Sequence, residues 1–154
     1  MANEVLNRVV EAPFRLTNKD AMLTEADGTA DAWSDIWKYQ VPNGSALVLK
    51  AHHTFAAYLE DGSAEVGSAT CQIQIEKRDS SGSDTFIVYG PDLYIASKEF
   101  QDVDLKARLR IPGDGVVINE REFLVIMVKD DGAIDASDSY FELHIGKVRK
   151  ALGI

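Results

Sequence analysis

Short runs of alternating apolar and polar residues, separated by turn residues, are the main feature of the chain. Residues 69–77 and 140–145 alternate with a period of two, so each run presents an apolar face and a polar face as a half-buried strand does. Residues 36–51 read as a hairpin around Pro42-Asn43-Gly44, because proline fixes φ and Asn-Gly tolerates a positive φ. The dominant periodicity is therefore that of β-structure.

Further strands are predicted at residues 54–59, 86–89, 93–96, 106–111, 116–118 and 123–128. Residues 123–128 are apolar on both faces, which predicts a position in the centre of a sheet. About nine or ten short strands, with turn signals roughly every 8–12 residues, indicate an all-β chain folded as a single-domain, jelly-roll-like β-sandwich. Residues 30–37 and 97–102 could each form one or two helical turns, and residues 147–152 either end a strand or form one turn.

The first 32 residues differ from the rest. Their apolar residues are sparse before Phe14, and residues 24–31 are small and acidic, which is typical of an extended arm followed by a loop. We therefore divide the chain into an N-terminal arm and acidic loop, residues 1–32, and a β-sandwich, residues 33–154. The arm could lie on its own sandwich or on a neighbouring chain, and the pattern does not choose between them.

The charge of the chain excludes some classes of binding partner. The 154 residues fit one domain, and their formal net charge is −9, of which residues 51–104 carry most, with ten acidic and three basic side chains. Such a surface repels polyanions, so nucleic acid is not an expected partner. The longest apolar run, residues 123–128, is too short to span a bilayer, and no signal peptide is expected at the start. We expect a protein made in the cytoplasm that uses no membrane.

Candidate chemistry is sparse. The single cysteine, Cys71, excludes an intramolecular disulfide and reads as a small core residue. His52 and His53 are adjacent between predicted strands and should point to opposite faces, so a metal would need a distant residue such as His144. The acids at 130–138 do not match a calcium-binding loop, although a non-standard cation site stays open. No catalytic motif is present, so we predict no enzyme, no cofactor and no metal; a hydrolase built on converging carboxylates is the open alternative.

One strand carries an unusual row of basic residues. Lys106, Arg108 and Arg110 lie two residues apart and share a strand face, where like charges repel each other. Acidic residues on a neighbouring strand could compensate them, or those of another subunit could, in a head-to-tail contact that closes a ring such as a trimer. The row is a candidate interface.

These features together resemble the capsid decoration (cementing) proteins of tailed bacteriophages. The similar segments are the arm at residues 9–16 and the hairpin at residues 37–49, followed by a long β-domain. The resemblance implies a homotrimer on the capsid exterior of the virion that clamps subunits of the major capsid protein. It also implies that residues 2–16 lie across a neighbour, so that their deletion weakens capsid binding without unfolding the β-domain. The expected anchors of this arm are Val5, Val9, Phe14 and Leu16.

Two other structural classes remain as alternatives. The chain could be another virion β-protein, such as a small jelly-roll capsid or tail protein. It could instead be a carbohydrate-binding β-sandwich module, which would need exposed coplanar aromatic rings. The candidates for such rings are Trp33, Trp37, Tyr89, Tyr94 and Tyr140.

Overall fold

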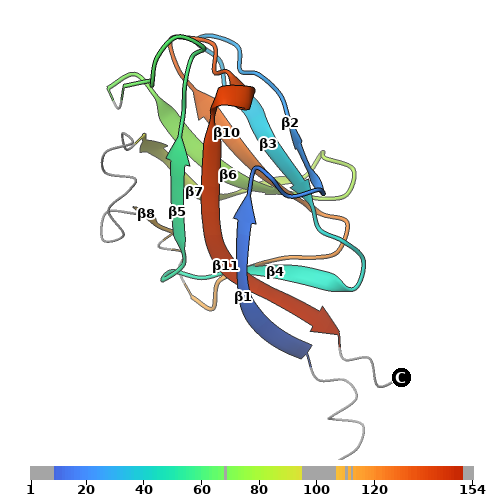
Figure 1. Ribbon diagram of the computed structural model, residues 1–154. Coiled ribbons are helices and arrows are strands. Elements are labelled where there is room, and N and C mark those ends of the chain that lie inside the picture. The colour runs from blue at the N-terminus through green and yellow to red at the C-terminus, as the bar shows by residue number, and fades with distance from the viewer. Residues whose placement is uncertain (1–8, 68, 95–106, 110, 112, 151–154) are drawn as a thin grey trace, which may run out of the picture.

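Two antiparallel β-sheets face each other across one apolar core in the computed structural model (Figure 1). The structure describes residues 9–67, 69–94, 107–109, 111 and 113–150. Within these residues the strands are β1 (Val9–Thr17), β2 (Leu23–Glu25), β3 (Ser34–Gln40), β4 (Ser45–Leu49), β5 (Thr54–Tyr58), β6 (Gln72–Arg78), β7 (Thr85–Leu93), β8 (Ala107–Arg108), β9 (Val116–Ile118), β10 (Phe123–Lys129) and β11 (Tyr140–Lys150). A 3-10 turn, η2 (Ala136–Asp138), precedes β11. The predicted all-β, jelly-roll-like sandwich is confirmed.

The strand order brings distant parts of the sequence together. Sheet A has the order β8-β5-β11-β4-β9, with β1 also paired to β11, and sheet B has the order β2-β3-β10-β6-β7. The central position predicted for residues 123–128 is correct, because β10 lies between β3 and β6. In the part of the chain that the structure describes, no helix is long and apolar enough to cross a membrane.

The last strand, β11, organises sheet A. β1 pairs with it over nine residues, from Val9 opposite Lys150 to Thr17 opposite Glu142. On its other edge, β5 pairs with residues 140–144 and β4 with residues 146–149. The strand bends between these two halves, and its second half leaves the sandwich together with the start of β1 (Figure 1).

Large side chains from both sheets fill the core. Trp37 of β3 and Phe141 of β11 pack against each other with ring centroids 4.8 Å apart. Each residue is at most 1% exposed. Cys71 is also fully buried, and burial raises the pKa of its thiol to about 12. It is therefore the small core residue that the sequence predicted, with no tendency to form a reactive thiolate.

The structure decides two expectations that the sequence left open. Residues 30–37 form no helical turn, because a turn at residues 30–31 leads into β3 at Ser34. Residues 147–150 continue β11 as a strand, since β4 and β1 supply hydrogen-bonding partners on both sides. The helical turn considered for residues 97–102 lies outside the described residues.

The segment expected to be an arm and a loop contributes strands to both sheets. β1 is a strand of sheet A, and β2 pairs with β3 in sheet B from Leu23 opposite Tyr39 to Glu25 opposite Trp37. Residues 9–17 therefore lie on the sandwich of their own chain. The compositional change near residue 32 does not coincide with a gap between structural units.

Candidate functional site

The described part of the predicted arm lies against its own chain. Leu16 is fully buried in the core, and Phe14 is partly buried, with its ring 6.2 Å from that of Tyr39 and 4.7 Å from the Lys147 ammonium. Val9 pairs with Lys150 at the far end of β1, and Val5 lies outside the described residues. A contact between these residues and a neighbouring subunit stays a prediction.

The predicted basic row falls mostly beyond what the structure describes. Arg108 lies in β8, at the edge of sheet A, opposite Thr54 of β5. Lys106 and Arg110 lie outside the described residues, so the compensation of the row by acids of this chain or of another remains open.

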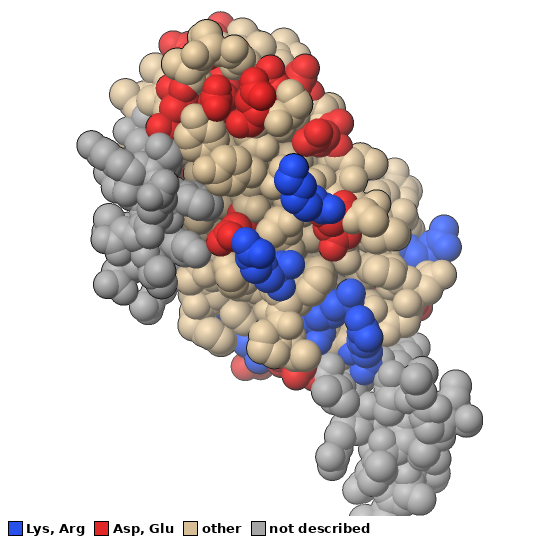
Figure 2. Space-filling model, viewed as in Figure 1, with Lys and Arg blue, Asp and Glu red and all other residues tan. Residues whose placement is uncertain are grey.

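Acidic residues gather at one end of the sandwich, where three loops meet (Figure 2). The loops are joined by backbone hydrogen bonds, from Gly28 N–H to the Ile134 carbonyl at 2.8 Å and from Asp135 N–H to the Glu60 carbonyl at 2.8 Å. Asp135 caps η2, and its hydrogen bond from Ser137 lowers the pKa of its carboxyl. These carboxylates shape turns, and no group of three or more His, Cys, Asp or Glu among the described residues is arranged to hold a metal ion.

The three histidines of the chain line one pocket on the outer face of sheet A. His52 and His53 lie in the turn between β4 and β5 with ring centroids 4.4 Å apart, and His144 of β11 lines the same pocket of about 440 Å³. The expectation that the adjacent pair would point to opposite faces is wrong, because strand alternation does not hold in a turn. The sequence offered no signal for His144 joining them, since the register of β11 against β5 decides it.

A hydrogen bond and an ion pair hold the residues around this histidine pocket in place. The Lys50 N–H donates to Nδ1 of His53 at 2.8 Å, and Lys50 Nζ lies 3.2 Å from a carboxylate oxygen of Glu11. Burial, with a smaller contribution from His52, lowers the pKa of His53. The neutral imidazole is thus favoured in the folded chain.

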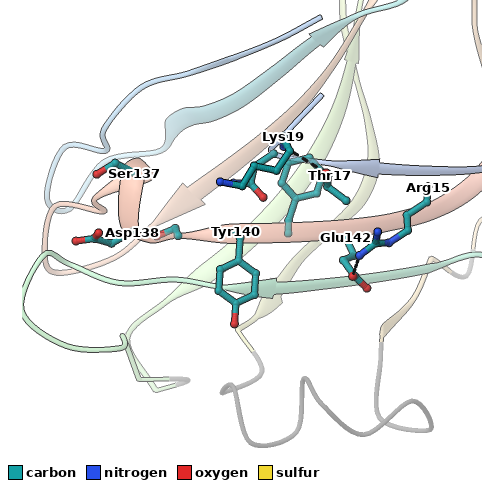
Figure 3. Close-up of a pocket in the computed structure, with 10 residues that line it drawn as sticks. Arg15, Thr17, Lys19, Ser137, Asp138, Tyr140 and Glu142 are labelled. Carbon is teal, nitrogen blue, oxygen red and sulfur yellow. Dashed lines mark hydrogen bonds and ion pairs between the residues drawn. The ribbon is translucent and has the colours of Figure 1, made fainter. Parts of the chain in front are cut away.

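A second pocket on the same face has mixed polarity (Figure 3). It has a volume of about 420 Å³ and lies between the C-terminal end of β1 and the N-terminal end of β11. The Arg15 guanidinium pairs with the Glu142 carboxylate along its wall, and the Tyr140 ring, 40% exposed, stacks on Tyr58 at 5.0 Å. Such a pocket can hold a small polar group, and the Ser137 hydroxyl that lines it donates a hydrogen bond to the carboxylate of Asp135.

The five candidate aromatic residues do not form one platform. Trp37, Tyr89 and Tyr94 are buried in the core, and Trp33 is half-buried. Tyr140 alone among the five is well exposed, and its stacking partner, Tyr58, was not a candidate. The carbohydrate-binding hypothesis therefore loses the coplanar set on which it depended.

The outer face of sheet B carries a polar network on β3 and β6. Arg78 of β6 donates two hydrogen bonds, of 2.6 and 2.8 Å, to Asp35 of β3 and one of 3.0 Å to Glu76. The hydrogen bonds from Arg78 hold the pKa of Asp35 below its usual range. Gln74 donates to Glu76 at 2.8 Å, and Val125, beneath this layer on β10, is fully buried.

Comparison with known proteins shows a likeness of fold. No protein-family model and no curated protein sequence matches the chain. Among solved structures, VP17, a capsid protein of bacteriophage P23-77, is similar with a TM-score of 0.59 and 7% identity, covering 92% of this chain and 98% of that one. A chain of the VP16-VP17 complex, a complex of the two major capsid proteins of that phage, matches with a TM-score of 0.60 and 7% identity, covering 91% and 99%. At this identity the likeness concerns the fold.

Proposed function

We propose that this chain is a virion structural protein that builds a phage capsid as a small jelly-roll subunit. The observation that carries the proposal is the extent of the similarity to VP17, which covers 92% of this chain and 98% of that one. A capsid protein of this size needs interfaces and no active site. The absence of a metal-binding group among the described residues is compatible with that role.

The same comparison supports a second shell protein as partner. VP17 occurs in a complex with VP16, and both are described as major capsid proteins. We propose that this chain likewise assembles with a second major capsid protein, and nucleic acid and lipid are not expected partners.

A shell role accounts for the observations better than a decoration role. The decoration hypothesis relied on an arm lying across a neighbour, whereas residues 9–17 pair with β11 of the same chain. A homotrimer on the capsid exterior remains the alternative, and it would depend on the basic row Lys106, Arg108 and Arg110.

The experiment that tests the proposal is deletion of the gene in the phage that encodes it, with quantitative mass spectrometry of purified particles. A shell protein should rank among the most abundant virion proteins, and its deletion should leave no closed particles. Closed but less heat-resistant particles after deletion would favour decoration, and absence of the protein from purified virions would refute both.

A further inference from the structure

Two turns that carry the chain from one sheet to the other lie side by side. Residues 41–44 join β3 of sheet B to β4 of sheet A, and residues 119–122 join β9 of sheet A to β10 of sheet B. Backbone hydrogen bonds connect the two turns, from Val41 N–H to the Glu122 carbonyl at 2.9 Å and from Arg121 N–H to the Val41 carbonyl at 2.7 Å. The start of the first turn is therefore held firmly.

The tip of the first turn is exposed and carries Asn43 and Gly44, the one asparagine–glycine step of the sequence. Ser45 N–H donates to the Pro42 carbonyl at 3.3 Å, and Gly44 has a φ of 79°, as the third residue of a type II turn does. Among the described residues, no atom lies within 4 Å of the position that a Cβ on Gly44 would take. The tip is therefore open to solvent and free of steric crowding.

An asparagine followed by glycine can lose its side-chain amide without an enzyme, because glycine has no side chain to hinder attack by its own nitrogen. The Gly44 backbone nitrogen gives up its proton and forms a bond to Cγ of Asn43, and the side-chain nitrogen leaves as ammonia with that proton. Solvent water then opens the resulting succinimide ring at either carbonyl. The product is aspartate or isoaspartate at position 43, and water is the only co-reactant.

The nitrogen that would attack already has a partner. Gly44 N–H donates to a carboxylate oxygen of Glu120, in the second turn, at 2.8 Å. A hydrogen bond to a charged acceptor keeps the proton on nitrogen, and the adjacent negative charge disfavours the amide anion that attack requires. A type II turn also gives its second residue a ψ of about 120°, which directs the Gly44 nitrogen away from the Asn43 side chain. The turn must therefore open and release Glu120 before the ring can close.

We propose that Asn43 is a site of spontaneous deamidation, and that the hydrogen bond from Gly44 to Glu120 sets its rate. The folded chain deamidates slowly while this bond is made and faster when it is broken. The product places a second carboxylate in the turn beside Glu120, where like charges repel each other, so the turn closes less readily afterwards. The proposal rests on the two turns alone and does not depend on the capsid assignment.

Incubation of the full chain at a pH of about 7.5 and about 37 °C, followed by tryptic digestion and mass spectrometry, tests the proposal. Cleavage after Lys38 and Lys50 releases residues 39–50, and deamidation adds about 1 Da to this peptide. Glu120→Ala should raise the rate about fivefold, and Glu120→Gln, which keeps an acceptor oxygen without the charge, should give an intermediate rate. The matched control, Glu25→Ala, removes the same charge from an exposed position in β2 and should behave as wild type.

The full chain unfolded in guanidinium gives the rate of the same peptide without the turn. This rate should exceed that of the folded wild type at least tenfold. Equal rates in folded wild type and Glu120→Ala would overturn the proposal, as would a folded wild type that deamidates as fast as the unfolded chain. A slower reaction in Glu120→Ala would also overturn it, because the carboxylate would then act as the base that removes the Gly44 proton.

Discussion

The ring of Phe14 in β1 lies 6.2 Å from the ring of Tyr39 in β3, centroid to centroid. This contact joins the first strand of sheet A to the opposite sheet, and Leu16, two residues later, is fully buried between them. β1 is therefore part of the core as well as an edge of sheet A. Its removal should affect folding before it affects any partner.

Truncation of the N-terminus should separate these roles. Removal of residues 2–8 leaves all nine β1–β11 pairs in place, so the unfolding temperature should stay nearly unchanged. Removal of residues 2–16 also takes Phe14 and Leu16, and losing one buried leucine alone costs about 2–5 kcal/mol. We expect the longer deletion to abolish cooperative thermal unfolding monitored by circular dichroism. A folded longer deletion, which the resemblance to decoration proteins implied, would show that β1 is a dispensable arm.

Trp37 offers a test of core polarity. Its ring is fully buried, and its Nε1 has no hydrogen-bond partner among the residues that the structure describes. Trp37→Phe removes this unpaired donor along with some volume, so the free energy of unfolding should change by less than about 1.5 kcal/mol. Trp37→Ala should cost about 3–5 kcal/mol. Urea denaturation measures both, and equally large losses would mean that Nε1 is bonded in solution.

Two glycines of one turn make a matched pair. Gly113 and Gly115 both have positive φ, of 68° and 98°, in the turn before β9. A Cβ on Gly113 would meet no atom within 4 Å, whereas one on Gly115 would lie 2.4 Å from the Leu49 carbonyl oxygen. Gly113→Ala should cost about 1 kcal/mol from φ alone. Gly115→Ala should cost about 2 kcal/mol more, because backbone must move. If both variants lost the same free energy of unfolding in urea denaturation, the backbone next to β9 would be able to shift away from the added Cβ at no extra cost.

The ion pair between Asp35 and Arg78 should make stability depend on pH at the acidic end. The folded-state pKa of Asp35 is lowered, so its stabilising effect is present above the unfolded value of about 3.9 and disappears as the pH falls through the folded value. Asp35 is 38% exposed, which limits the effect to about 1 kcal/mol or less. The difference in unfolding free energy between wild type and Asp35→Asn should shrink from pH 7 to pH 3. If this difference in unfolding free energy stayed constant with pH, it would arise from packing and not from the charge of Asp35.

How far the sequence reaches is clear from particular residues. The alternation of apolar and polar residues identified β6 and β11. The apolar run at residues 123–128 predicted the central place of β10, because a strand buried on both faces is apolar at every position. The sequence pattern of β1 is a weaker signal for a core strand. Among its side chains that the structure describes, Phe14 and Leu16 reach the core, and its partner, β11, lies more than 120 residues away in the chain.

The surfaces were less predictable than the strands. One row across sheet A contains Val117, Val48, Gly146 and Pro13, which come from four separate strands. Each residue alone resembles an ordinary outward position of a strand. The histidine pocket depends on the same register together with a turn at residues 51–52, which the alternation rule does not describe.

His53 should make the fold less stable as the pH falls towards 5. Burial, His52 and Lys50 lower its pKa, and Glu11 opposes them, so the folded chain holds the proton less well than the unfolded chain does. Stability is then fully present above the unfolded value of about 6.5 and declines as the pH drops below it. His53→Asn should remove this decline, since its amide oxygen can still accept the hydrogen bond from Lys50 N–H but does not titrate.

Proton NMR titration of the imidazole signals, with urea denaturation at pH 7.5 and 5, checks this expectation. His52→Asn serves as the control within the pocket: it removes the second-largest cause of the shift, so the pKa of His53 should rise while burial still holds it below its ordinary value. If His53→Asn retained the full decline, the pH dependence would belong to groups outside this pocket.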